Sequence, residues 1–225
     1  MQIPWRKHCG FRKLLVIAHS IGNRGKVYER GLVCGWRIRD EVLGSLKRTD
    51  KLDYMKLRQF IESRFLDQTV NEKIEDAYYF NADPEPPTAK QNAFHNALQY
   101  PPPGGPGLRV KLYWLQEKEL FWPAHMGGSS VVHPVTGEHY KQTIQKAVDV
   151  GLAFHLMRSF SKRRWGTLFF FAGDSDFHEA IQHLVEHEDV NLVLIGTLQT
   201  ISQELRPYAR NIVEIDKQAA QISRP

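Results

Sequence analysis

Two apolar runs in the second half of the chain, the second interrupted only by Asn191, restrict its fold more than any other feature. They cover residues 168–172 and 190–195, and neither alternates with polar residues. A strand that is apolar on both faces belongs in the middle of a sheet that helices cover on both sides. The sequence therefore predicts an α/β domain built around buried parallel strands.

Strand patterns and helical patterns alternate along the rest of the chain. Strands are expected at 14–18, 31–38, 74–80, 108–115, 168–172, 190–195 and 212–215, and helices at 54–61, 88–99, 145–160, 176–187 and 202–209. Residues 122–141, rich in Gly, Pro, Ser and His, are expected to form a long loop or a hairpin. We predict one three-layer α/β/α domain with a mostly parallel central sheet. In such sheets the site lies at the carboxyl ends of the strands.

An acidic pair follows the first apolar run. In Gly173-Asp174-Ser175-Asp176-Phe177 two carboxylates stand one residue apart, where the strand ends and the next helix opens. Such a turn can face one hard cation, because Mg²⁺ or Mn²⁺ prefers a few carboxylates plus waters and phosphate oxygens. The alternative is capping, since Asp176 and Glu179 have the spacing of a capping box. Capping explains one acid but not Asp174 as well.

A third acid, Asp149, stands in the first turn of a predicted helix that is otherwise apolar. Val148, Leu152 and Leu156 mark a buried stripe on this helix, and Gly151 permits close packing. An acid beside such a stripe is costly unless it is paired or binds a metal ion. The alternative is that the carboxylate stabilises the helix N-terminus.

The two acidic segments together resemble a known pattern. Residues 146–150 read Lys-Ala-Val-Asp-Val, similar to a Lys-Gly-Val-Asp-Val motif, and residues 173–177 are similar to a Ser-Gly-Asp-Ser-Asp-Phe motif. Both motifs occur, in this order, in the NYN domain family, in its LabA-like branch within the PIN-like nuclease group. Segments 53–57, 77–81 and 202–205 resemble the same family, so the resemblance covers about residues 53 to 216.

The resemblance implies a divalent-metal-dependent ribonuclease with a PIN-like, Rossmann-like fold. In this interpretation Asp149, Asp174 and Asp176 bind Mg²⁺ or Mn²⁺, directly or through water. The chemistry agrees, since a metal ion lowers the pKa of bound water and clamps phosphate oxygens without a Ser or Cys nucleophile. The candidate contacts to RNA phosphates are Lys146, Lys162, Arg163 and Arg164. For 162–164 the alternative is a solvated helix end that suits the helix dipole.

The chain departs from the family pattern at two places. The family has a second Asp six residues after the first, where this chain has His155. His155 lies about 240° further round the helix than Asp149, so we expect a neighbouring or surface residue rather than a ligand. The family's first strand ends in an acid, and that place holds Ser20 after one predicted strand and Asp40 after the next. Asp40 is the candidate, with a helix N-cap as the alternative.

The positive charge of the chain is concentrated at its start. Residues 1–39 hold nine Lys and Arg against one acid, whereas the remainder has a slight excess of acids. Basic segments of this kind bind nucleic acid, contact anionic membranes or act as targeting peptides; the alternative is a solvated basic face. We expect a basic extension at 1–39 that can include a first strand, an NYN/PIN-like domain at 40–217 and a tail at 218–225.

Composition excludes several other classes. The chain is 42% hydrophobic with 16 glycines, which is usual for a globular protein and not for a disordered or collagen-like one. Two cysteines cannot make a disulfide framework, which favours a reducing compartment. The early apolar run at 14–18 is too short to span a membrane. We therefore expect a cytoplasmic protein without membrane contact.

Two further sets of residues give weaker signals. His125, His133 and His139 lie in the predicted loop but lack zinc-site spacing, so contact with RNA beside the site is the better hypothesis. The aromatic residues Trp114, Phe121 and Trp122 suit either base stacking or hairpin packing.

Three functions are compatible with these patterns. The first is a metal-dependent endoribonuclease acting on single-stranded or loop RNA. The second is an RNA-binding regulatory protein whose catalytic site is degenerate, which His155 and the uncertain first acid favour. The third is a metal-dependent phosphohydrolase of a small substrate, which the basic N-terminal segment argues against.

Overall fold

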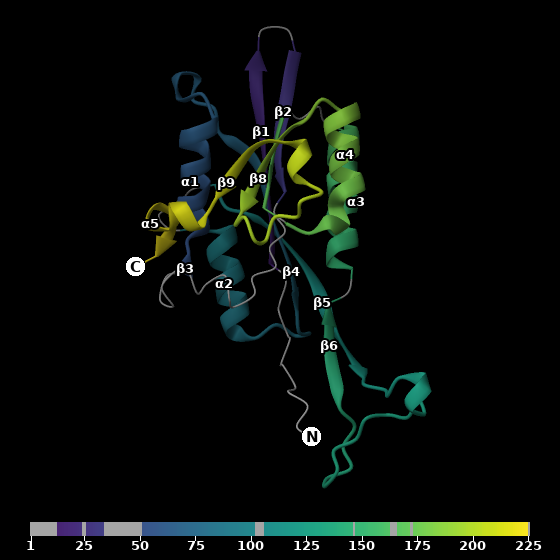
Figure 1. Ribbon diagram of the computed structural model, residues 1–225. Helices are drawn as coiled ribbons and strands as arrows, with labels where there is room; N and C mark the ends of the chain where they lie inside the picture. Colours follow the sequence, from purple (N-terminus) through teal and green to yellow (C-terminus); the bar gives the residue numbers. More distant parts are fainter. Residues whose placement is uncertain are drawn as a thin grey trace.

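The computed structural model has three layers, with one central sheet between two layers of helices (Figure 1). It describes residues 13–23, 26–33, 51–101, 106–145, 147–162, 166–171 and 173–224. The strands of the central sheet are β1 (Lys13–Asn23), β2 (Lys26–Val33), β4 (Ile74–Asp83), β5 (Arg109–Glu119), β6 (Lys141–Gln145), β7 (Thr167–Phe170), β8 (Asn191–Gly196) and β9 (Ala209–Glu214). The helices are α1 (Tyr54–Phe65), α2 (Ala89–Gln99), α3 (Val148–Lys162), α4 (His178–His187) and α5 (Ala219–Ile222).

The sheet has the order β6-β5-β4-β1-β2-β7-β8-β9. Strands β2, β4, β5, β7, β8 and β9 run parallel, whereas β1 and β6 run antiparallel to their neighbours. Helices α1, α2 and α5 cover one face, and α3 and α4 cover the other (Figure 1). The predicted three-layer α/β/α fold with a mostly parallel sheet is confirmed.

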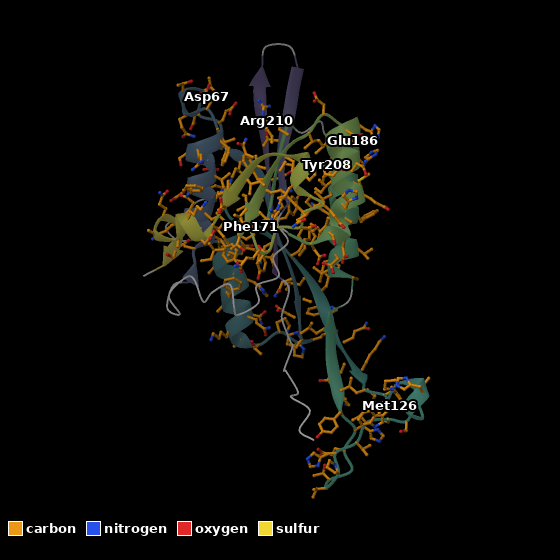
Figure 2. All side chains as sticks on the ribbon, in the orientation of Figure 1. Asp67, Met126, Phe171, Glu186, Tyr208 and Arg210 are labelled. Carbon is orange, nitrogen blue, oxygen red and sulfur yellow. The ribbon has the colours of Figure 1, made fainter. Side chains whose placement is uncertain are left out.

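The apolar runs are central strands because both of their faces are buried. In β7 every residue is buried, and successive side chains enter different cores. Leu168 and Phe170 pack beneath α3 and α4, whereas Phe169 and Phe171 pack beneath α1 and α5. Figure 2 shows Phe171 in the middle of the molecule. The period of two along a strand thus supplies two cores from one apolar run.

Side-chain caps fix the starts of the first two helices. Asp53 accepts hydrogen bonds from the backbone N–H groups of Met55 at 2.9 Å and Lys56 at 3.2 Å. Thr88 and Gln91 form a reciprocal capping box at the start of α2. These caps satisfy donors that would otherwise have no partner in the first turn.

The structure corrects several predicted boundaries. The helix expected at 145–160 begins at Val148, because Gln145 is the last residue of β6 and pairs with Leu115 of β5. The helix expected at 176–187 begins at His178, after the 3₁₀ turn η3 (Ser175–Phe177). The strand expected at 31–38 is seen at 26–33, and residues 34–38 lie outside the described part.

The α-helix expected at 202–209 is wrong. Residues 203–205 form a turn, and the 3₁₀ helix η4 (Arg206–Tyr208) follows. Pro207 has no backbone N–H to continue an α-helix. The guanidinium of Arg206 also binds the carbonyls of Leu198 and Ile201, which holds the segment against the preceding loop.

The segment expected to be a long loop or hairpin is a hairpin. Strands β5 and β6 pair antiparallel from Leu115 opposite Gln145 to Glu119 opposite Lys141, and two isolated bridges extend the pairing. This β5–β6 arm (residues 115–145) projects beyond the helical layers (Figure 1), with the 3₁₀ turn η2 (Ala124–Met126) near its tip. Met126 is 58% exposed and lies far from the body of the domain (Figure 2).

The C-terminal residues pack against the start of α1. The backbone N–H of Asp53 donates to the carbonyl of Ile222 at 2.8 Å, and β10 (Ser223–Arg224) pairs with β3 (Lys51–Leu52). Two 3₁₀ turns, η1 (Gln68–Val70) and η5 (Asp216–Gln218), complete the elements.

The domain bounds expected from the sequence stay a prediction. Within the described residues, no helix is long and apolar enough to cross a bilayer.

A buried ion pair fastens α1 to the strands beneath it. The Arg58 Nε donates to Glu62 Oε1 at 3.1 Å, and both side chains are almost wholly buried. The same guanidinium donates to the carbonyls of Pro106 and Ile74, and Glu62 accepts from the Ile74 N–H at 3.0 Å. Burial lowers the pKa of Arg58 from its usual value. One side chain therefore joins α1, the start of β4 and the segment before β5.

We expect Arg58→Met to lower the free energy of unfolding by about 3–5 kcal/mol, because Glu62 stays buried and two carbonyls lose a donor. Urea denaturation measures the change. The matched control is Arg64→Met on the same helix, where an exposed guanidinium contacts Phe60 and Phe65; its cost should stay below about 1 kcal/mol. Equal losses in the two variants would contradict the role given to Arg58.

Candidate active site

The acidic turn (residues 173–176) follows β7 and lies against the loop that follows β8. A Cβ atom on Gly173 would overlap the backbone carbonyl of Thr200, so only glycine permits this approach. The Gly173 carbonyl accepts a hydrogen bond from the Ser202 N–H at 2.8 Å. The Thr197 N–H in turn donates to Thr200 Oγ1 at 3.0 Å, which folds the second loop on itself. The turn is thus held by backbone contacts at the carboxyl edge of the sheet.

Within the turn, Asp174 and not Asp176 caps the following 3₁₀ helix. Asp174 Oδ1 accepts from the Asp176 N–H at 3.3 Å. Asp174 is half-buried, whereas Asp176 is exposed. The start of α4 has no side-chain cap, so the capping box considered for Asp176 and Glu179 is not formed. Phe177 anchors the turn by packing edge-on against Phe170, with ring centroids 5.5 Å apart.

The N-terminus of α3 carries Asp149 to the same region. Helix α3 contacts η3, and Val148 shares the buried core beneath α3 and α4 with Phe177. Asp149 itself is half-buried in the first turn of α3. The structure therefore brings the three predicted acids to neighbouring elements at one edge of the sheet.

The backbone at the start of α3 is unusual. Ala147 has a φ of +67°, a left-handed conformation that favours glycine, and the family motif described above has glycine there. About one helical turn later, Gly151 is required by close packing, since a Cβ would overlap the phenol of Tyr113. The Tyr113 ring stacks on Phe80 at 6.5 Å, and burial raises its pKa. The close packing expected at Gly151 is confirmed.

Other predicted site residues fall outside the described part. Residues Asp40, Lys146, Arg163 and Arg164 are not among those the structure describes, and Lys162 is placed only as the last residue of α3. Strand β2 runs parallel to β7, with Leu32 opposite Phe169, so its carboxyl end faces the edge that carries the acidic turn. Strand β1 runs the other way, which puts Ser20 toward the opposite edge. This topology favours Asp40 over Ser20 as the site of a further acid.

His155 is a packing residue. Its ring lies edge-on to Tyr78 at 4.2 Å and to Phe80 at 5.4 Å, and its Nε2 is buried with no hydrogen-bond partner in the described part of the chain. Burial first, and then the charges of Lys111, Arg158 and Arg109, lower the pKa of His155 to about 4 against the opposing effect of Asp76. At neutral pH the ring is therefore uncharged.

The donor chemistry suits a hard cation held by few protein ligands. Across the described residues, no group of three or more His, Cys, Asp or Glu side chains is arranged to hold a metal ion. Mg²⁺ in proteins often keeps several waters and binds through one or two carboxylates plus substrate phosphates. The half-buried carboxylates of Asp149 and Asp174 fit that requirement, and they do not fit a closed zinc site.

The arm residues have structural roles of their own. His139 Nδ1 lies 2.6 Å from Ser130 Oγ, and His133 Nδ1 accepts from the N–H groups of Val135 and Thr136. Of the aromatic candidates, Trp114 and Phe121 are exposed and Trp122 is half-buried. Nothing in the arm gathers these histidines into one site, so its contact with RNA stays a prediction.

One buried carboxylate escaped the sequence analysis. Asp83 ends β4 and is 1% exposed. It accepts from Asn81 Nδ2 at 2.6 Å and Gln91 Nε2 at 3.1 Å, and it lies 3.3 Å from His95 Nε2. Ala77, Tyr79, Asn81 and Asp83 stand on one face of β4 by the period of two of a strand, and that spacing was the available signal. Asp83 therefore ties β4 to α2. It lies on the face of the central sheet opposite to the face that α3 and Asp149 cover.

The fold and site define an α/β protein with an acidic, half-buried edge of the kind that serves phosphodiester chemistry. The NYN domain matches residues 43–216. The chain therefore belongs to the NYN domain family, a nuclease-type family whose members generally use divalent metal ions. The assignment to its LabA-like branch stays a prediction.

Other comparisons add little. A comparison with curated proteins gives no match. Among solved structures, a protein of unknown function from Vibrio parahaemolyticus is similar, with 17% identity and a TM-score of 0.49 over 82% of this chain and 88% of that one. A similarity of this size says nothing about function.

We expect Gly173→Ala to lower the free energy of unfolding by about 3 kcal/mol, since the added Cβ meets backbone that cannot move aside cheaply. Thermal and urea denaturation test this. The control is Ser175→Ala in the same turn, an exposed position where the change should stay within about 0.5 kcal/mol. A well-tolerated Gly173→Ala would show that the two loops do not lie in contact.

Stability should also depend on pH through His155. Its folded pKa lies below the unfolded value, so the unfolded chain binds the proton first and stability falls as pH drops from about 6.5 to about 4. We expect a loss of about 1–2 kcal/mol, discounted because the ring stays partly open to solvent. Urea denaturation at both pH values measures it. His155→Phe should remove this loss, whereas His125→Phe in the exposed arm should retain it.

Proposed function

We propose that the chain is a divalent-metal-dependent endoribonuclease that hydrolyses phosphodiester bonds of single-stranded or loop RNA. The observation that carries this proposal is the acidic turn. Backbone contacts at Gly173 hold Asp174 at the carboxyl edge of the sheet, next to η3, and η3 contacts α3, whose first turn carries Asp149. Membership of a nuclease-type family supports the same class of reaction.

The ligands proposed for Mg²⁺ or Mn²⁺ are Asp149, Asp174 and Asp176, with Asp40, which follows β2 by seven residues in the sequence, as a further acid. When bound, such an ion makes water a better nucleophile and offsets negative charge on the scissile phosphate. The chain's own part is to hold carboxylates at this edge. Asp149 lies at the positive end of the α3 dipole, and Asp174 Oδ1 accepts a hydrogen bond from the Asp176 N–H.

RNA would be held near this edge by basic residues. The proposed phosphate contacts are Lys146, Lys162, Arg163 and Arg164, which flank the two ends of α3 in the sequence. Their charges would add a salt-dependent, sequence-independent contribution to binding. The basic segment at 1–39 would act in the same way.

A second function, an RNA-binding regulator without activity, is favoured by two observations. The described residues contain no group of three acidic or metal-binding side chains arranged around one ion. The family's second acid on α3 is replaced by His155, which is packed against Tyr78 and uncharged at neutral pH. These observations make direct measurement of cleavage the deciding experiment.

We expect end-labelled single-stranded RNA to be cut internally in the presence of Mg²⁺ or Mn²⁺ and to stay intact with EDTA. Asp174→Asn and Asp149→Asn should each lower the rate at least about 100-fold, because each removes a charge from the reacting edge. The control is Asp216→Asn, an exposed acid outside the turn, which should leave the rate unchanged. Metal-dependent cleavage that survives Asp174→Asn would refute the site, and binding without cleavage would establish the regulatory alternative.

A further inference from the structure

Two exposed histidines stand one helical turn apart at the end of α4. His183 and His187 have the i, i+4 spacing that puts two side chains on one face of a helix. Their ring centroids are 5.1 Å apart, with an angle of 49° between the ring planes. The His183 side chain is 46% exposed, and His187 is exposed as well. Both imidazoles are therefore accessible to a ligand from solvent.

The separation of the two rings suits a shared metal ion. Zn–N bonds are about 2.0–2.1 Å long, so two imidazoles on one tetrahedral ion have ring centres about 5 Å apart. Two histidines at this spacing on a helix can bind Zn²⁺ together, because one helical turn brings them to the same side of the ion. Imidazole also suits Zn²⁺ and Cu²⁺ better than it suits Mg²⁺.

A carboxylate stands beside the histidine pair. His183 Nε2 lies 3.9 Å from Glu188 Oε1, and the Glu188 side chain is 41% exposed. Two ligand atoms on one tetrahedral zinc ion lie about 3.4 Å apart, so a small rotation of either side chain brings both to the same ion. Across the part of the chain that the structure describes, no three such side chains already surround one point. The ion would therefore gather three exposed side chains, with water as a fourth ligand.

The charge around the end of α4 favours a cation. Residues 165–205 contain seven Asp and Glu but no Lys or Arg. Three of these acids, Glu186, Glu188 and Asp189, are exposed at the end of the helix, and Figure 2 shows Glu186 at the outer surface of the molecule. The negative end of the helix dipole adds to their effect. A divalent ion is thus attracted to the place where the two histidines lie.

This place is separate from the acidic turn. Helix α4 follows the turn through η3, and His183 and His187 lie about 8 and 14 Å along the helix axis from its first residue. Metal–ligand bonds of about 2 Å are too short for one ion to reach both places. The ligand types differ as well, since carboxylates and water suit Mg²⁺ whereas imidazole suits Zn²⁺.

We propose that His183, His187 and Glu188 bind one borderline divalent transition-metal ion, of which Zn²⁺ is the example, at the end of α4. The inference does not depend on the proposed ribonuclease function, because none of these residues belongs to the acidic turn. The ion would join two successive turns of α4, whose Ile181 and Leu184 are buried beneath it. Zinc should stabilise the folded chain, because the unfolded chain does not hold the two imidazoles together.

The test compares two full-length variants with the wild type. The α4 variant, His183→Gln with His187→Gln, removes both imidazoles. The matched control, His125→Gln with His139→Gln, removes two exposed histidines of the β5–β6 arm. Calorimetric titration with ZnCl₂ at about pH 7.5, in excess Mg²⁺ to occupy sites for hard cations, counts the zinc ions bound. Urea denaturation with and without Zn²⁺ measures the stabilisation.

We expect the α4 variant to bind one zinc ion fewer than the wild type and to lose a zinc-dependent rise in the urea midpoint. The control should keep both. Glu188→Gln should weaken zinc binding about 10-fold, since losing one partner around a metal ion costs about 10- to 100-fold in affinity.

Equal numbers of zinc ions in the α4 variant and the wild type would overturn the proposal. So would an equal loss in the control, or displacement of the ion by Mg²⁺, which would indicate oxygen ligands alone. These outcomes are distinguishable from failure of the ribonuclease, which is measured by RNA cleavage and its dependence on Asp174.

Discussion

The acidic edge of this protein depends on one place where two backbones meet without a side chain between them. Gly173 lets the turn after β7 lie directly against Thr200 in the loop after β8. The hydrogen bond from Ser202 to the Gly173 carbonyl fixes the approach, and Phe177 buries the far side of the turn. Asp174 and Asp176 therefore occupy a position set by backbone geometry instead of by the flexible contacts of their own side chains.

Helix α3 connects this edge to the rest of the functional surface. Its buried stripe of Val148, Leu152 and Leu156 seats it on the sheet, which leaves Asp149 at one end and Arg158 toward the other. His155 fills the gap against Tyr78 without adding charge. Asp149 and Arg158 are thus held at separate places on one helix.

The sequence predicted the layers because strands as apolar as β7 and β8 can be buried only in the middle of a sheet that helices cover on both faces. The sequence could not predict that β1 runs antiparallel to its neighbours, since a parallel and an antiparallel strand can have the same apolar pattern. The helix expected at 202–209 failed because loop contacts of Arg206 overrode local propensity. Local motifs were enough to single out Asp149, Asp174 and Asp176, whose role stays a prediction, whereas Asp83 depends on His95 and Gln91 of α2, which spacing alone does not reveal.

The β5–β6 arm has a consequence for how the molecule opens. Its pairing is between residues close in sequence, its tip is exposed, and beyond Leu115 it lies outside both buried cores. Its free energy of opening is therefore set by its own short ladder and not by the global stability of the domain. Amide hydrogens near the tip should exchange as one fast unit while those of β7 and β8 stay protected, so the projection can change shape without loosening the acidic edge.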